Sequence, residues 1–217
     1  MESRNIRIAR MLSLTCQAGE VVIMDLDGTL ANGSHRLHLL PTKDMHLTET
    51  WREFNAAAKD DAPIANTIEM FNALIRGGKT GVVLTGRSGE FLSDAVHWLS
   101  SHKCHYDFLV MRGAEDNRKD TVIKEEFLRA VGLDRILCAF DDSPAVIAHF
   151  RSMGITTYAV TEYADKDRHD LKSHGVEKLP GTCFMCNGAG FLVDEHREDS
   201  CSYCGGSGFY DAESARK

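Results

Sequence analysis

The sequence predicts an α/β fold of three layers, in which helices cover both faces of a mainly parallel sheet. Two observations predict it. Short apolar runs of strand length alternate with segments of helical periodicity, and this alternation continues over residues 21–160. Strand-helix-strand units of this kind cross over with the right hand and bring the carboxyl ends of their strands to one edge of the sheet, where ligands bind. We therefore expect residues that follow the strands to gather there.

Five apolar runs are the predicted strands, and five segments with apolar residues three and four positions apart are the predicted helices. In chain order they are strand Val21–Asp25, helices Thr48–Lys59 and Ile64–Arg76, strand Thr80–Leu84, helix Glu90–His102, strand Asp107–Met111, helix Thr121–Val131, strand Ile136–Phe140, helix Pro144–Met153 and strand Ile155–Val160. Together they form a Rossmann-like three-layer sandwich.

The remaining segments suggest a division of the 217 residues into one main domain and a small appendage. We expect an N-terminal extension over residues 1–19, the α/β domain over 20–163 with a small cap-like insertion at 32–63 after the first strand, a linker at 164–180, a small C-terminal cysteine module at 181–210 and a tail at 211–217. The insertion is too short for a large cap.

Composition excludes several classes of protein. A formal charge of -7 and a pI near 5.8 give no general attraction to polyanions, so contact with nucleic acid would need a local basic cluster. No apolar run reaches the roughly 18 residues of a membrane span, and the first residues make a poor signal peptide. The odd number of cysteines, seven, does not suggest a secreted disulfide framework. We expect a cytoplasmic protein without membrane contact.

The first predicted strand carries the clearest chemical signal, because it delivers Asp25 and Asp27 into the turn Asp27-Gly28-Thr29. Residues two apart on a strand point the same way, so both carboxylates would emerge together. One could act as a nucleophile and the other as an acid. An ordinary Asp-Gly turn after a buried strand is the alternative explanation.

Three further segments carry polar groups at comparable positions. Thr85-Gly86-Arg87 follows the second strand, where a hydroxyl and a guanidinium suit phosphate. Lys124 falls in the first turns of a helix, and Asp141-Asp142 ends another buried strand. Adjacent carboxylates repel unless a cation intervenes, which suggests Mg²⁺. Taken singly, a surface arginine or an exposed helix lysine would explain these residues equally well.

The four segments in this order resemble the motifs of the haloacid-dehalogenase-like phosphohydrolases, whose first motif is DxDGT. The resemblance implies that Asp25 attacks phosphorus and forms an aspartyl-phosphate, while Asp27 is the acid and base. Thr85 and Lys124 would neutralise charge. Mg²⁺ would be held by the Asp25 carboxylate, the Asp27 backbone carbonyl and an acid of the fourth motif, with Asp142 favoured as the ligand and Asp141 in support.

The stretch Arg118-Lys119-Asp120-Thr121-x-x-Lys124-Glu125-Glu126 is more closely similar to the phosphatase half of phage polynucleotide kinase/3′-phosphatases. That resemblance implies a nucleic-acid end as substrate, in the host cytoplasm if the chain is phage-encoded. Some of these charges could instead merely solvate a loop. The expected substrate-binding residues are Arg36, Gly86, Arg87, Arg112, Arg118 and Asp120.

The substrate itself stays open at this point. The sequence contains no Gly-x-x-x-x-Gly-Lys-Ser/Thr loop, so we expect a phosphatase without kinase activity in these residues. Removal of 3′-phosphates from DNA or RNA ends is the leading prediction, and a 5′(3′)-deoxyribonucleotidase or other mononucleotide phosphatase is the rival. A hypothesis of another class is an adaptor protein whose cysteine module is the working part and whose enzyme core is vestigial.

Two copies of Cys-x-x-Cys-x-Gly-x-Gly lie near the C-terminus and resemble the cysteine-rich repeats of J-domain co-chaperones. Fourteen residues separate the two cysteine pairs, a spacing just short of the usual zinc-ribbon range. Four thiolates leave no open position on the metal, so we expect a structural Zn²⁺, with a protein as a possible partner of the module. The expected zinc ligands are Cys183, Cys186, Cys201 and Cys204.

Overall fold

The structure is a computed structural model, and it describes residues 3–160, 191–194, 197–200 and 202. The chain divides into two compact units, Met1–Lys166 and Asp167–Lys217. In the second unit the described residues form a hairpin in which β8 (Phe191–Asp194) pairs antiparallel with β9 (Arg197–Ser200). The first unit contains the fold that positions the candidate site.

A five-stranded sheet forms the middle layer of the first unit. Its order is β5-β4-β1-β6-β7 and all four pairings are parallel, which confirms the predicted α/β class and the mainly parallel sheet. The strands are β1 (Val21–Met24), β4 (Thr80–Ser88), β5 (Phe108–Arg112), β6 (Ile136–Asp141) and β7 (Thr157–Ala159). The last strand is shorter than predicted, and β4 runs past Leu84 where we expected a turn.

Alternation along the buried strands sends side chains to two cores. In β1, Val22 and Met24 belong to one apolar cluster and Val21 and Ile23 to the other, as the period of two requires. Helices α3 and α4 contribute to the first cluster and helices α1, α5 and α6 to the second, so the sheet is covered on both faces. The bounds are α1 (Arg4–Thr15), α3 (Ala65–Arg76), α4 (Leu92–Ser101), α5 (Asp120–Val131) and α6 (Pro144–Ser152).

Helices α3, α4, α5 and α6 lie within three residues of the predicted segments, because each carries one continuous apolar stripe. Outside the insertion, short 3₁₀ turns precede α4 and β6, namely η4 (Gly89–Phe91) and η5 (Leu133–Arg135). No helix among the described residues is both long enough and apolar enough to cross a bilayer.

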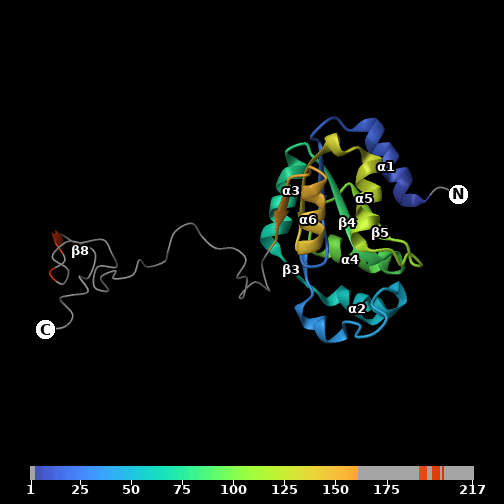
Figure 1. Cartoon of the computed structure of the whole chain (residues 1–217), viewed down its shortest axis with the longest axis horizontal. Coiled ribbons are helices and arrows are strands. Elements are labelled where there is room, and N and C mark those ends of the chain that lie inside the picture. The colour runs from blue at the N-terminus through green and yellow to red at the C-terminus, as the bar shows by residue number, and fades with distance from the viewer. Residues whose placement is uncertain (1–2, 161–190, 195–196, 201, 203–217) are drawn as a thin grey trace. The chain divides into compact units, whose positions relative to one another are not determined.

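The segment that we set apart as an N-terminal extension contains helix α1, which packs on α5 (Figure 1). Ala9 and Leu12 are buried in the same core cluster as residues of α5. At the start of the helix, Arg4 Nη1 donates to the carbonyl of Leu109 at 3.0 Å and Asn5 Nδ2 to that of Met111 at 2.7 Å. Because both acceptors belong to β5, α1 fixes the edge of the sheet.

The insertion after β1 is built differently from the single helix that we predicted at Thr48–Lys59. The observed elements are η1 (Ser34–Leu39), η2 (Thr48–Trp51), α2 (Arg52–Ala56) and η3 (Ala57–Asp60). A short antiparallel pair, β2 (Ala31–Asn32) with β3 (Ala62–Pro63), closes the base of the insertion. The predicted helix breaks up because its buried residues are small or polar and form no continuous apolar stripe. Figure 1 shows α2 at one end of the first unit.

Candidate active site

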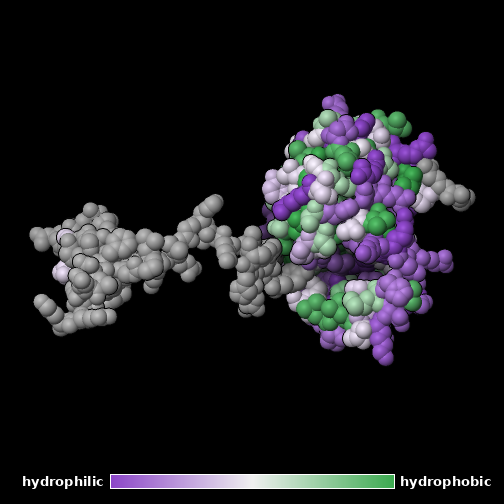
Figure 2. All heavy atoms as spheres, viewed as in Figure 1, coloured by the Kyte–Doolittle hydropathy of each residue, from purple (hydrophilic) through white to green (hydrophobic). Residues whose placement is uncertain are grey.

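The polar residues singled out in the sequence gather at the carboxyl end of the sheet, around a cavity of about 540 Å³. Figure 2 shows a hollow bordered by hydrophilic residues between the sheet and the insertion. Strand ends, the start of α5 and the loop after β5 provide one side, and the insertion provides the other. The lining residues include Asp25, Asp27, Thr85, Gly86, Arg87, Arg112, Arg118, Lys119, Asp120, Lys124, Asp141, Asp142 and Ser143.

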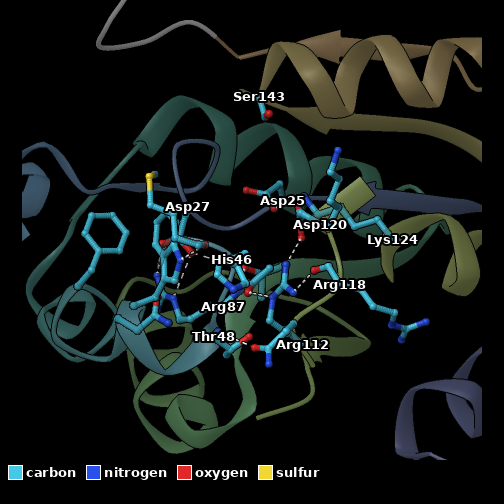
Figure 3. A pocket seen from close by; sticks show the side chains of 18 of the residues that line it. Asp25, Asp27, His46, Thr48, Arg87, Arg112, Arg118, Asp120, Lys124 and Ser143 are labelled. Atoms are coloured by element: carbon cyan, nitrogen blue, oxygen red, sulfur yellow. Dashed lines mark hydrogen bonds and ion pairs between the residues drawn. The ribbon is translucent and has the colours of Figure 1, made fainter. Parts of the chain in front are cut away.

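Lys124 lies at the centre of an acidic cluster, where α5 places its side chain with only 4% exposed. Its Nζ is 2.8 Å from Asp25 Oδ1, 2.9 Å from Asp141 Oδ2 and 3.1 Å from Asp120 Oδ2. The carboxylates come from β1, from the end of β6 and from the first turn of α5. Figure 3 shows Asp25, Asp120 and Lys124 facing one another.

A single ammonium group, that of Lys124, faces several carboxyl groups in this cluster, and the pKa values of these groups are shifted accordingly. Burial raises the pKa of Asp25 well above its usual value; Lys124 opposes this, while Asp141 and Asp142 reinforce it. Burial and Asp141 likewise raise the pKa of Asp142 to about 6. For Lys124, burial lowers the pKa, but Asp25 and Asp141 outweigh it and the lysine stays charged. When its carboxyl groups are ionised, the cluster therefore has more negative charge than the single ammonium can neutralise.

Asp27 has the opposite environment, between two arginines. Arg87 Nη2 is 2.5 Å from Asp27 Oδ1 and Arg87 Nε is 3.2 Å from Oδ2, while Arg36 also donates to Oδ1. Burial raises the pKa of Asp27, but the two arginines outweigh burial and lower it to about 2. The Thr85 hydroxyl is 3.5 Å from Asp27 Oδ2. Asp27 is thus ionised while both arginines hold it.

Arg36 does not line the cavity directly, although the sequence suggested a contact with substrate. Its side chain is 1% exposed, and Nε and Nη2 each donate to Asp61 at 2.7 Å. Its guanidinium also lies 3.9 Å from the centre of the Phe54 ring. Sequence reasoning missed Asp61, which belongs to no motif and lies 25 residues from Arg36. The structure places Arg36 behind Asp27, where it links the insertion to that carboxylate.

Gly86 and Asp120 approach each other so closely that a larger residue at position 86 would force the Asp120 side chain to shift. A Cβ at position 86 would lie 2.5 Å from Asp120 Oδ1. Arg112 is engaged by backbone: its Nε donates to Gly86 O at 2.9 Å and its Nη1 to Arg118 O at 2.6 Å. The Arg118 side chain is half exposed and pairs with Asp116 and with Glu126. These arginines shape and border the cavity loop.

The insertion supplies a wall that sequence reasoning did not anticipate residue by residue. Thr48 ties it to the loop after β5, because its N–H donates to Asn117 Oδ1 and its hydroxyl to Asp116 O, both at 2.7 Å. We call the following cavity-lining residues the insertion wall: Met45, Leu47, Trp51, Phe54 and Asn55. The sequence analysis placed Trp51 and Phe54 in the predicted helix Thr48–Lys59 and assigned neither of them a contact with the cavity.

The acidic cluster fits a divalent cation in its chemistry, although its carboxylates are not arranged around one. Within residues 3–160 and the described hairpin, no three His, Cys, Asp or Glu side chains form a ready metal cage; Asp25 and Asp141 instead contact Lys124. Surplus charge and hard oxygen donors are what Mg²⁺ selects. The expected zinc ligands Cys183, Cys186, Cys201 and Cys204 lie outside the described residues.

Comparison with known proteins agrees with this arrangement. A family model described as the polynucleotide kinase PNKP phosphatase domain, of the haloacid dehalogenase superfamily, matches residues 19–164. The match includes every candidate residue of the cavity and ends before the cysteine module. No curated protein matches the chain in sequence.

Solved structures show the same fold. Two chains from structures of the Pnkp1/Rnl/Hen1 RNA repair complex match this chain. The first has a TM-score of 0.54 at 24% identity and covers 66% of this chain, and the second has a TM-score of 0.53 at 25% identity and covers 68%. In both cases the match covers 46% of the repair-complex chain. A putative phosphatase from Clostridium difficile matches with a TM-score of 0.50 at 15% identity, over 66% of this chain and 85% of that one. The chain therefore spans less than half the length of the repair-complex chains that it resembles.

Proposed function

Because the chain belongs to the family of polynucleotide kinase PNKP phosphatase domains, and is thus a phosphatase, we propose that it removes 3′-phosphates from DNA or RNA ends through an aspartyl-phosphate at Asp25. The observation that carries the proposal is the pair of contacts from Lys124 Nζ, at 2.8 Å to Asp25 and 2.9 Å to Asp141. These contacts orient one buried carboxylate at the carboxyl end of β1, beside an acid of β6.

In the first step, Asp25 Oδ attacks phosphorus and the P–O bond to the nucleoside breaks. The electron pair of that bond leaves with the 3′ oxygen, which takes a proton from Asp27. Lys124 stabilises the negative charge shared between Asp25 and the transferring group, as preorganised cations do in transition states. The products of this step are a 3′-hydroxyl end and phosphorylated Asp25.

Asp27 must be protonated to serve as the acid, so its arginine partners have to release it. A bound phosphate offers Arg87 the bidentate acceptor geometry that guanidinium groups prefer, in competition with the Asp27 carboxylate. In the second step Asp27 takes a proton from water, the water oxygen attacks phosphorus, and the bond to Asp25 breaks. Inorganic phosphate leaves and Asp25 is regenerated.

Residues of the acidic cluster would hold Mg²⁺, with Asp25, the backbone carbonyl of Asp27 and Asp142 as ligands and Asp141 in support. When bound, the ion would neutralise phosphate charge that Lys124 alone cannot offset. This assignment is a proposal supported by the surplus of carboxylates around Lys124 and by the raised pKa of Asp142.

Two observations favour a polynucleotide end over a free mononucleotide. The matching family is one of polynucleotide phosphatases, and Arg118 and Lys119 present exposed basic groups at the border of the cavity. Such groups contact the phosphates of neighbouring nucleotides in nucleic-acid complexes. The mononucleotide phosphatase stays the rival proposal.

Parallel assays of phosphate release separate these proposals. With Mg²⁺ present, we expect the highest kcat/KM on a 3′-phosphorylated oligonucleotide, little release from its 5′-phosphorylated counterpart, and lower values on 3′- and 5′-mononucleotides. Asp25→Asn should abolish release from all of them, whereas Leu37→Ala, an exposed change in the insertion away from the cavity, should not. A large preference for mononucleotides would instead establish the rival.

A further inference from the structure

The insertion wall is the part of the cavity that the phosphatase chemistry leaves unused. The reacting groups occupy the sheet side, and a phosphoryl group fills only a small share of about 540 Å³. That volume is in the range of pockets that hold whole small molecules. The cavity therefore has room, against Trp51 and its neighbours, for the ester that carries the phosphate.

Trp51 is held rigidly in this wall. Its indole Nε1 donates to the carbonyl of Met45 at 2.9 Å, and its ring meets the Phe54 ring edge to face, with centroids 5.8 Å apart at 83°. Phe54 in turn lies against the guanidinium of Arg36, which contacts Asp27. The aromatic wall is thus connected to the catalytic acid through ring and ion contacts.

Because the only hydrogen-bond donor of the indole is already used, Trp51 can offer a ligand only its aromatic surface and dispersion contacts. Recognition of this kind suits a flat apolar ring. It distinguishes a nucleobase from no base at all, but not one base from another, since every base has a stacking face.

Asn55 gives an independent indication of a ligand at the same wall. Asn55 is only 7% exposed and lines the cavity. Its side-chain amide nevertheless has no hydrogen-bond partner in the described part of the chain. Its amide atoms are not among the fully buried ones of the described residues, so they are open to the cavity and can donate to or accept from a ligand there. Trp51 and Asn55 are four residues apart across the start of α2, a spacing that puts both on one helical face.

We infer that the insertion wall is a nucleoside subsite, in which Trp51 stacks on the base next to the scissile phosphate and Asn55 hydrogen-bonds the same nucleoside. The inference deepens the proposed function and rests on it. It makes the enzyme selective for phosphates carried on a base-bearing nucleotide and indifferent to which base is present.

Steady-state kinetics on two matched oligonucleotides test the inference. Both end in a 3′-phosphate, and one has a stable abasic residue in place of the terminal nucleoside. On the base-bearing substrate Trp51→Ala should lower kcat/KM about tenfold or more, mainly through KM. On the abasic substrate the same variant should match the wild type. Trp51→Phe should retain most of the activity, and Leu37→Ala should behave as wild type on both. Equal loss on both substrates, or no loss on either, would overturn the inference.

Fluorescence separates this inference from the proposed function, because the chain has two tryptophans and the other one, Trp98, is 2% exposed and donates to Asp61 O. In an Asp25→Asn background, 3′-phosphorylated mononucleotides of all four bases should quench Trp51 with similar Kd, and deoxyribose phosphate should not. The signal should vanish when Trp51→Phe is added. If nucleotides quench Trp51 but the wild type releases phosphate from no 3′-phosphorylated substrate, the proposed function is contradicted and the subsite stands. If the wild type releases phosphate but no nucleotide quenches Trp51, the subsite is contradicted.

Discussion

At the scale of single residues, two neighbouring carboxylates acquire different properties from different surroundings. Asp25 is buried beside Asp141 and Asp142 and has a raised pKa, whereas Asp27, two residues away, has its pKa lowered to about 2 by Arg87 and Arg36. The ionisation of each carboxylate therefore depends on residues from other segments, among them the insertion, β4 and the end of β6, and the DxD spacing alone does not set it.

Gly86→Ala tests how closely the site is packed. The added Cβ would lie 2.5 Å from Asp120 Oδ1, so the carboxylate must shift, and its Oδ2, which is 3.1 Å from Lys124 Nζ, must shift with it. Since displacements of about 1 Å cost around a hundredfold in rate, we expect kcat/KM to fall by about that factor. The control is Gly113→Ala, whose Cβ would lie 3.5 Å from Asp116 Cβ, an ordinary van der Waals contact. Equal activity in the two variants would show that the close approach is unimportant.

Lys124→Ala tests the buried ion cluster through stability. Removing the ammonium leaves Asp25 and Asp141 buried and without their cation, and breaking such a buried pair costs about 3–5 kcal/mol. Urea unfolding without metal should show this loss. Lys119→Ala, at an exposed position just before α5, should change the free energy of unfolding by less than about 0.5 kcal/mol. A similar small change at Lys124 would contradict the cluster's role.

The sequence could predict that residues following the strands lie close together, although it does not establish their roles. Asp25, Lys124 and Asp141 converge because parallel strands end at one edge, and that edge follows from alternation alone. Asp61 and Asn55 could not be found in this way. Both lie in the insertion, whose path no repeat or apolar period specifies.

At the scale of elements, the strands of the sheet and the longer helices beside it were predictable from the sequence, whereas the short elements of the insertion and helix α1 were not. β1 was predicted because Val21–Met24 is a continuous buried run, and α3 because one face is apolar throughout. Helix α1 escaped prediction because its apolar residues are interrupted by Arg7 and Arg10 and only Ala9 and Leu12 are buried. Short elements with few buried residues leave little periodic signal in the sequence.

Helix α1 should nevertheless contribute as a true core element. Leu12 is 1% exposed against α5 and Leu14, on the same helix, is 85% exposed. We expect Leu12→Ala to lower the free energy of unfolding by about 2–5 kcal/mol, the usual cost of a buried leucine. Leu14→Ala should lower it by less than about 0.5 kcal/mol. Denaturant titration of both variants checks the pair, and equal effects would mean that α1 is peripheral.

At the scale of the whole molecule, an acidic chain presents a cluster of carboxylates around one lysine at the end of its sheet. If Asp142 is a ligand, Mg²⁺ binds the native state and stabilises it, by about 2.7 kcal/mol at a hundred times Kd. For a chain of this size that corresponds to a rise in Tm of about 5–10 °C.

Thermal unfolding with and without Mg²⁺ measures this effect. Asp142→Asn should remove most of the rise in Tm, while Asp134→Asn, whose side chain is 70% exposed in η5, should keep it. An identical rise in wild type and Asp142→Asn would assign the ion to other ligands.

The central claim is that Asp25 is the nucleophile, and trapping the intermediate tests it most directly. The enzyme is mixed with an oligonucleotide carrying a labelled 3′-phosphate, quenched in acid during turnover and digested, and the labelled peptide is identified. The account predicts an acyl phosphate on Asp25 that is absent in Asp25→Asn. Release of labelled phosphate with no label on the protein, or with label on another residue, would contradict it.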